Sequence, residues 1–311
     1  MNPVFRREAK TSLRSWRSFV AVSLYVLASF GVIILALAVG GMGGGGSNPR
    51  NISQMSGVMA GFKLALIGLI VPAICAGSIN GERERQTLDL MLITKMSPWS
   101  IVFGKLLSSL IFIVLLLVAG LPVFGIMFYY GSFSPLHMAV QTSFMLITAS
   151  MVASIAILCS CIFRRVVFSI ITSYLLLILF TIGTLIFVNV MFGVLQSIHW
   201  TNTQDSLIFV PFVLSQAWQN TFLVMLSLNP IAGFTSLIDS QMGSESFRIL
   251  LPHGLNNLNT WGSLELWQLS MITNGAISAI CMALAAYAIK PIKGVNYGKQ
   301  GKRAGKGSAS A

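Results

Sequence analysis

The sequence predicts an all-α membrane protein with several spans, and three observations carry this prediction. Hydrophobic residues make up 55% of the 311 residues, and charged residues make up only 9%. A soluble domain usually has about a quarter of its residues charged. The apolar residues also form runs of the length that crosses a bilayer, which takes roughly 20 residues as a helix. The net charge of +12 lies in short basic clusters beside these runs, so membrane topology explains it better than nucleic-acid binding does.

Six apolar runs are long enough to span a membrane. They cover residues 19–40, 58–79, 101–129, 137–163, 166–196 and 266–289. The third and the fifth are longer than needed, which predicts tilt or extension beyond the membrane. We therefore expect a six-span transmembrane domain over residues 19–293, followed by a basic, flexible tail over 294–311.

A further apolar segment, residues 206–227, contains polar residues in its middle, such as Gln216 and Asn220. Spanning would bury these groups in the bilayer at a cost, and would also move the basic C-terminus outside, against the positive-inside tendency. The sequence therefore predicts one external region over residues 197–265, with 206–227 as a re-entrant or interfacial hairpin. A spanning arrangement stays open. Both termini are expected to be cytoplasmic.

Two segments are predicted on the cytoplasmic face. Residues 1–18 have apolar residues at helical spacing among basic ones, which predicts an interfacial helix; a plain topology signal is the alternative. Residues 81–97 hold an unusual concentration of charge between two spans. A helix from about residue 82 to 93 would place Leu88 and Leu92 on an apolar side and would expose Glu82 and Asp89 on another. A solvated turn that marks the membrane boundary fits the composition equally well.

The stretch SINGERERQTLDLMLITKMSPWSIVFGK, residues 78–105, resembles the signature of ABC-2 type permeases, the membrane subunits of one class of ATP-binding-cassette (ABC) transporters. That family has a Glu-Arg-Glu, a Thr-Leu-x-Leu-Leu, a Thr-x-x-Ser-Pro and a Gly-Lys in this order. The chain matches this order with modest departures, such as Met91 and Lys95. Asn2-Pro3 near the start and Asn229-Pro230 before the last span are also similar to the family pattern.

The resemblance implies that residues 81–97 form a coupling helix, which sits in a groove on a cytoplasmic ATPase subunit and transmits its closure to the spans. The residues that it implies for this contact are Glu82, Arg83, Glu84, Arg85, Thr87, Leu88 and Asp89. Arg164 and Arg165, between the fourth and fifth spans, are the expected second contact, or else a plain positive-inside turn. Two copies of the ATPase and a second permease, identical or homologous, are the implied partners, together with membrane lipids.

The chain has no G-x-x-x-x-G-K-[ST] phosphate loop, so ATP and Mg²⁺ are expected in the partner ATPase rather than here. We find no catalytic set of nucleophile, base and orienting acid, and no metal-ligand spacing among the four cysteines. The polar positions inside the spans are interhelical hydrogen-bond partners or, alternatively, part of a substrate path. They are Thr181, Thr184, Asn189, Thr273 and Asn274, with Lys63 near the outer end of its span.

The function expected from these features is a permease subunit, without enzymatic activity of its own, in the plasma membrane of a bacterial cell. Its apolar interior favours export of an amphiphilic or hydrophobic substrate such as a peptide, lipid or drug. An ATP-independent channel or secondary transporter would require intramembrane charges or repeated broken helices, which are not clear in the sequence. A membrane anchor that docks a soluble partner is the third possibility.

Overall fold

The computed structural model describes residues 20, 22–32, 34, 49–84, 98–122, 125, 134–203, 216–242, 260–261 and 264–289. The described elements are almost all helices. In chain order they are α3 (Pro49–Cys75), α4 (Asn80–Glu84), α6 (Pro98–Ala119), α8 (Pro135–Ile162), α9 (Val166–Ile178), the π-helical turn η1 (Leu179–Gly183), α10 (Thr184–Thr203), α11 (Gln216–Leu228), α12 (Pro230–Met242), the short strands β1 (Thr260–Trp261) and β2 (Leu264–Glu265), and α14 (Leu266–Ala288). A short apolar helix, Val22–Val32, precedes α3.

Five helical stretches among the described residues are long and apolar enough to cross a membrane. They are Gly57–Glu84, Trp99–Ala119, Pro135–Ile162, Val166–Ile198 and Leu266–Ala288. Each corresponds to one of the predicted spans, so the prediction of an all-α, multi-pass membrane protein is confirmed. The remaining predicted span, 19–40, is described mainly as the helix Val22–Val32, and the predicted interfacial helix 1–18 and tail 294–311 lie outside the described residues.

The segment before the last span differs from the prediction in its boundaries. α11 and α12 form a bent helical pair with an angle of 103° between them, which is either one broken span or a re-entrant loop. The prediction placed the apolar hairpin at 206–227, whereas the structure has its break at Asn229 and continues the second arm to Met242. Pro230 explains the break, because proline lacks the N–H that a continuous helix needs and favours the first position of a new one.

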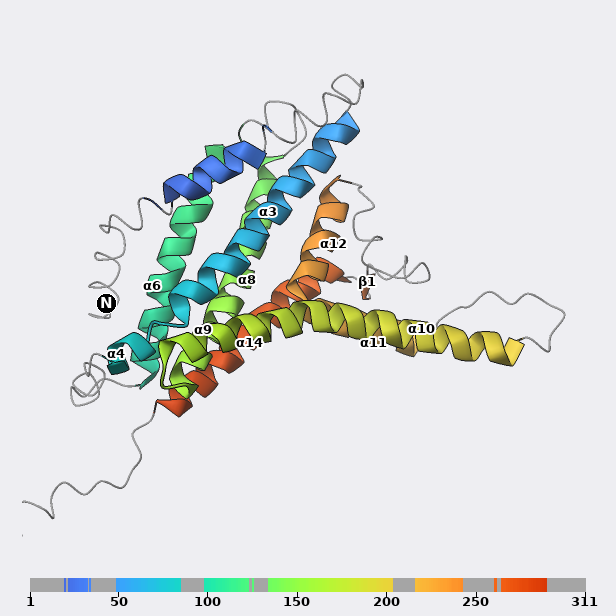
Figure 1. The fold of residues 1–311 in the computed structure, drawn as a ribbon. Coiled ribbons are helices and arrows are strands. Elements are labelled where there is room, and N and C mark those ends of the chain that lie inside the picture. The colour runs from blue at the N-terminus through green and yellow to red at the C-terminus, as the bar shows by residue number, and fades with distance from the viewer. Residues whose placement is uncertain are drawn as a thin grey trace, which may run out of the picture.

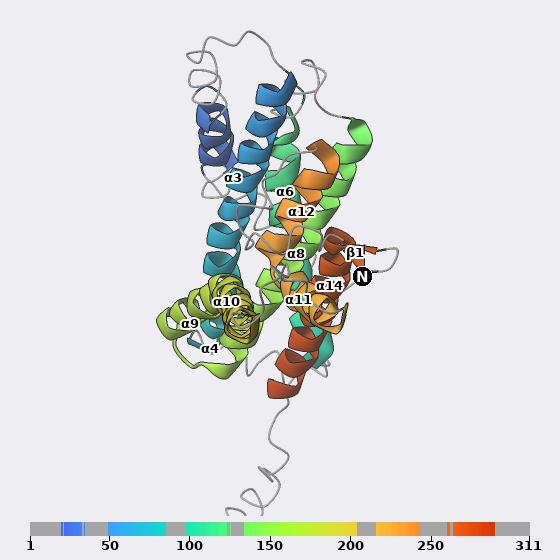
Figure 2. The ribbon, with the colours of Figure 1, turned by 90° about the vertical axis from the view of Figure 1, so that its right-hand side faces the viewer.

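α8 lies at the centre of the bundle and packs against α3, α6, α9 and α14. Figures 1 and 2 show α3, α6 and α8 rising together, while α9, η1 and α10 form one long rod that runs at a steep angle to α3 and projects beyond it. In the most apolar 18-residue stretch of α8, 67% of the residues are buried within this chain. In the corresponding stretch of the rod, only 17% are buried. The rod therefore presents most of its surface outward from this chain.

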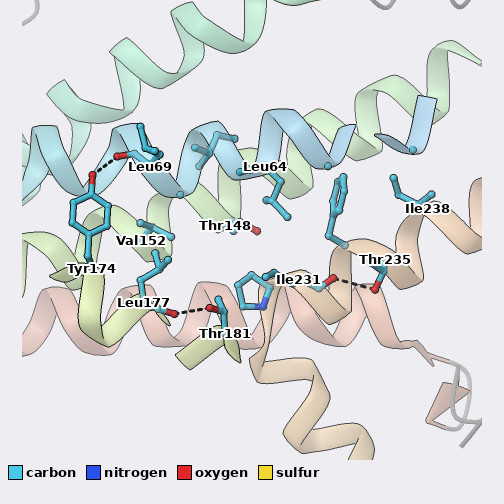
Figure 3. A pocket seen from close by; sticks show the side chains of 17 residues that line it. Leu64, Leu69, Thr148, Val152, Tyr174, Leu177, Thr181, Ile231, Thr235 and Ile238 are labelled. Carbon is cyan, nitrogen blue, oxygen red and sulfur yellow. Dashed lines mark hydrogen bonds between the residues drawn. The ribbon is translucent and has the colours of Figure 1, made fainter. Parts of the chain in front are cut away.

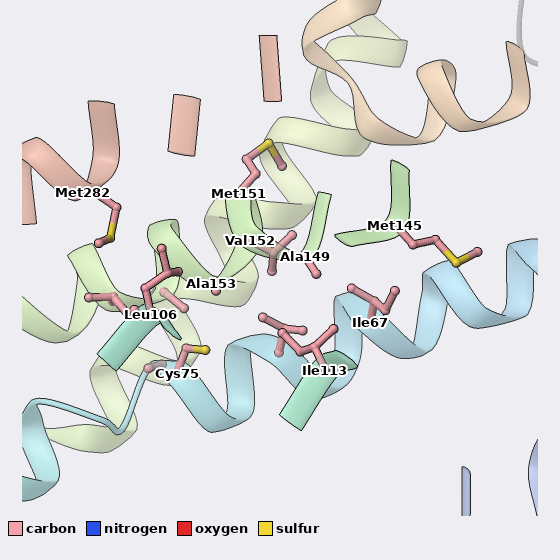
Figure 4. Packing of buried hydrophobic residues seen from close by; sticks show 14 of the residues in the cluster. Ile67, Cys75, Leu106, Ile113, Met145, Ala149, Met151, Val152, Ala153 and Met282 are labelled. Carbon is pink, nitrogen blue, oxygen red and sulfur yellow. The ribbon is translucent and has the colours of Figure 1, made fainter. Parts of the chain in front are cut away.

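Small side chains allow close packing around α8. Ala149, Ala153 and Ala156 are fully or almost fully buried, and Figure 4 shows two of them within the central cluster. In membranes small residues let helix backbones approach, and the gain comes from van der Waals contact rather than from escape from water. The Ser154 hydroxyl lies 2.8 Å from that of Ser278, which adds a polar link between α8 and α14.

Candidate functional site

The short helix α4 is bonded to three other helices, α6, α8 and α9, at one end of the bundle. The chain turns after α3, and the backbone N–H groups of Ile79 and Asn80 both donate to the Ser160 hydroxyl oxygen, at 3.2 and 3.1 Å. The first N–H groups of a helix have no partner within it, so a side-chain acceptor stabilises the start of α4. Since Ser160 is in the last turn of α8, these bonds fix α4 to the centre of the bundle.

An ion pair joins α4 to α6. The Lys105 Nζ lies 2.6 Å from Glu82 Oε1, and the two side chains are only 7% and 17% exposed. A partly buried pair of this kind is costly to break, because removing one partner leaves a charge in a poorly solvated place.

Three further bonds, made by two side chains of α4, join it to the end of α8 and the start of α9. The Arg83 guanidinium donates to the backbone carbonyls of Phe163 at 3.3 Å and Cys161 at 3.5 Å, at the end of α8 where carbonyls lack helical partners. Glu84 Oε1 accepts from the Val166 N–H at 3.4 Å, which places an anion at the positive end of α9. We call this arrangement the α4 junction: residues 79–84 with Lys105, Ser160 and the turn 163–166.

A second polar cluster surrounds the break between α11 and α12. The Asn229 Oδ1 accepts from the Ile231 N–H at 2.8 Å and so caps the start of α12. Its Nδ2 donates to the Thr181 carbonyl at 2.6 Å and to the Thr184 hydroxyl at 2.7 Å, both in the rod. On the other side, the Thr273 hydroxyl of α14 donates to the Ser227 carbonyl at 2.7 Å. We call these residues the Asn229 clamp.

Comparison with protein families decides the class of the chain. The family model for the ABC-2 family transporter protein matches residues 2–292. The chain belongs to the ABC-2 transporter family. It is therefore the membrane component of an ABC transporter, and the resemblance seen in residues 78–105 is confirmed at the level of the family. None of the curated proteins compared with the chain matches it.

The α4 junction of this permease holds some of the residues predicted for ATPase contact, but not in the expected orientation. Glu82 was expected to be exposed; instead its side chain is 17% exposed and paired with Lys105. Arg83 is also directed inward, to the end of α8. Only Glu84, Arg164 and Arg165 among the described members of that set are exposed. The predicted residues Arg85, Thr87, Leu88 and Asp89 lie outside the described residues.

Sequence reasoning did not single out Lys105 or Ser160 as members of this site. Lys105 was noted as part of the Gly-Lys motif, but its partner is 23 residues away, and Ser160 is about 80 residues from the N–H groups it accepts from. A basic residue near the start of a span and a serine inside one are both common. No local pattern distinguishes these two, and only the packing of α4 brings them together.

Of the five polar positions considered for a substrate path, three belong to the Asn229 clamp and two lie outside it. Thr181, Thr184 and Thr273 belong to the Asn229 clamp, and so they act in this structure as interhelical hydrogen-bond partners. Asn274 is buried on α14, with Nδ2 3.5 Å from the Ser270 hydroxyl. Asn189 is exposed on α10, where its amide donates to the Leu185 carbonyl one turn earlier. None of these contacts tests a role in transport.

Lys63, which the sequence places near the outer end of its span, turns inward instead of towards a membrane surface. Its side chain is 1% exposed, and its Nζ donates to the Gly120 carbonyl at 3.0 Å, just past the end of α6. The reason is the glycine: a Cβ at position 120 would lie 2.9 Å from the Tyr25 hydroxyl and 3.0 Å from the Lys63 Nζ. The missing side chain leaves room for the lysine to turn inward.

Replacing Asn229 by alanine should loosen the bent pair. The change removes the cap of α12 and both bonds to the rod, and we expect the free energy of unfolding to fall by about 2 kcal/mol. Thermal unfolding of the purified permease would measure this loss. The matched control is Asn189→Ala on the exposed side of the same rod, for which we expect about 0.5 kcal/mol or less. Equal losses in the two variants would show that the clamp does not stabilise the bend.

Proposed function

We propose that this chain is the permease subunit of an ABC exporter, and that the α4 junction passes the movement of a separate ATP-hydrolysing subunit to the spans. The observation that carries the proposal is that one five-residue helix is bonded to α6, to the end of α8 and to the start of α9. A push on residues 81–97, the segment that the family resemblance assigns to coupling, would therefore act on three spans together rather than on one. ATP and Mg²⁺ would be bound by the partner subunit.

The exposed charges at the α4 junction are suited to a partner surface. Glu84, Arg164 and Arg165 are all exposed. The two arginines are consecutive in the sequence, and the Glu84–Val166 bond holds Glu84 next to the residue that follows them. Because the other charges of α4 are occupied within the chain, these three are the described candidates for contact with the ATPase. Complementary charges at such a surface direct association and orientation more than they add affinity.

Sidedness and assembly are parts of the same proposal. The concentration of basic residues near the α4 junction and in the tail supports placing this face and both termini in the cytoplasm of a bacterial cell, with the chain in the plasma membrane. A Lys299→Cys variant should then react with a membrane-impermeant thiol reagent only after the cells are opened. Reaction in intact cells would contradict this orientation.

A second permease, identical or homologous, would complete the path for an amphiphilic or hydrophobic substrate.

The ATPase contact can be tested by reversing the two arginines. Arg164→Glu with Arg165→Glu should weaken association with the ATPase subunit on the order of tenfold at low salt, without unfolding the permease. Retention of the ATPase on the immobilised permease would measure this. Arg248→Glu, in the predicted external region, is the control and should leave retention unchanged. Equal retention of the ATPase by the double variant and the control would exclude the turn 163–166 as a contact. If the chain were instead a membrane anchor that works without an ATPase, no nucleotide-hydrolysing subunit would be retained even by the parent chain.

A further inference from the structure

A pocket of about 480 Å³ lies between α3, α8, the α9–η1 part of the rod and α12, away from the α4 junction. Figure 3 shows side chains from these helices around it. Its volume is within the range of about 300–1,000 Å³ of sites that hold small molecules. No charged residue is among its lining residues, which are mostly leucine, isoleucine, valine, alanine and glycine. A charged ligand would lose its hydration there without gaining a counter-ion, so an occupant must be neutral.

Glycines on α3 create part of this space. Gly57, Gly61 and Gly68 line the pocket, and a Cβ added at Gly61 or Gly68 would meet no atom within 4 Å. The three positions lie on one face of the helix, at spacings of four and seven residues. On this face the backbone of α3 therefore lines the pocket directly, whereas side chains at these three positions would take up part of its volume.

One hydroxyl in the pocket is unused. Three of the four polar lining residues donate to main-chain carbonyls: Tyr174 to Leu69, Thr181 to Leu177 and Thr235 to Ile231 (Figure 3). Thr148 is the fourth. Its side chain is 2% exposed, and within the part of the chain that the structure describes its hydroxyl has no hydrogen-bond partner. A buried hydroxyl without a partner is unfavourable, and an acceptor on a bound molecule would remove that penalty.

We propose that this pocket binds a neutral amphiphile, whose alkyl part lies along the glycine face of α3 and whose single hydrogen-bond acceptor meets Thr148. Such a molecule is either an uncharged lipid of the surrounding bilayer or the transported cargo, since both can have this chemistry. In the second case the inference deepens the proposed function by giving its substrate class. The binding itself requires neither ATP nor a partner subunit.

The first test uses the permease in phosphatidylcholine nanodiscs, free of detergent, with a long-chain alcohol that carries a photoactivatable diazirine. Cross-linked peptides should come from the pocket-lining helices. Gly68→Leu should reduce this labelling by tenfold or more, because a Cβ at this pocket-lining position meets no atom within 4 Å and the larger side chain takes up space in the pocket. Gly275→Leu on α14, where a Cβ also meets no atom within 4 Å, is the matched control and should label like the parent chain. Equal labelling in both variants, or labelling outside these helices, would overturn the proposal.

The second test addresses the hydroxyl. Thr148→Val keeps the shape and removes the donor, so it should weaken binding of the probe roughly 2- to 10-fold while leaving the fold intact. Unchanged binding would refute the role of Thr148 as the donor. Mass spectrometry of molecules that co-purify with the parent chain and are lost in Gly68→Leu separates the two sources: an uncharged membrane lipid such as a diacylglycerol indicates the bilayer, and a neutral amphiphile that is not a membrane lipid indicates the cargo. A charged phospholipid lost in the same way would contradict the proposal. Because no ATPase is involved, failure here would leave the proposed coupling function untouched.

Discussion

Replacing Gly233 by alanine should lower the free energy of unfolding by about 3 kcal/mol, because α12 and α14 touch at this residue. A Cβ at position 233 would lie 2.2 Å from the Ser270 Oγ and 2.4 Å from its Cβ. Ser270 is fully buried, so its side chain has no free volume to move into. The two helices would have to separate, and the packing of the bent pair on the last span would be lost.

The clash also predicts a rescue. Ser270→Gly added to Gly233→Ala should restore most of the stability, since it removes the two atoms within 3 Å of the new methyl group and leaves only the Phe144 Cζ, at 3.2 Å. Gly61→Ala is the matched control, with open space at its Cβ and an expected change of about 0.5 kcal/mol or a small gain. Thermal unfolding of the three variants would decide the matter. A Gly233→Ala protein as stable as Gly61→Ala would show that α12 and α14 are not packed this closely.

Breaking the Glu82–Lys105 pair should have the second large effect, on both stability and coupling. Lys105→Glu leaves two carboxylates facing each other in a place that is less than a fifth exposed, and we expect a loss of about 3 kcal/mol. Glu82→Lys should act similarly through two facing cations. Combining the two changes restores opposite charges across the same gap, so the double variant should regain more than half of the stability. Thermal unfolding of the purified proteins would measure these changes.

The same series tests transmission. If α4 moves α6 through this pair, each single variant should slow ATP-driven transport more than it slows ATP hydrolysis. The double variant with the two charges exchanged should restore the ratio of transport to hydrolysis. For the stability measurements alone, Glu84→Lys is the control for a reversed charge on α4: its carboxylate is exposed, and the expected loss of stability is below about 1 kcal/mol. A swap no more stable than either single variant would mean that the pair is not the contact that holds α4 on α6.

The long helices were predictable because a span needs length and apolar composition, which are local properties. The predicted run 137–163 and the observed Pro135–Ile162 differ by only one or two residues at each end. The break at Asn229 also had a local signal, an asparagine cap followed by proline at the first helical position. The polar residues of 206–227 argue only against a simple span, and they carry no information about where the helix bends.

The contacts that build the site were not predictable in the same way. Thr181 and Thr184 were predicted to be interhelical hydrogen-bond partners or part of a substrate path, but Asn229, the residue that they meet, lies more than 40 residues further on. The inward orientation of Glu82 depends on Lys105, and that of Lys63 on the absence of a side chain at Gly120. Each is decided by which helix lies opposite, so a periodic pattern within one helix carries no information about it.

The most direct test of the central claim is to place a photo-cross-linking amino acid at Glu84 and irradiate native membranes before mild-detergent purification. The account predicts a cross-link to a soluble subunit with a Walker phosphate loop, found by mass spectrometry together with one or two permeases. A complex that keeps other partners but contains no such ATPase, or a cross-link that stays within the permease, would contradict it.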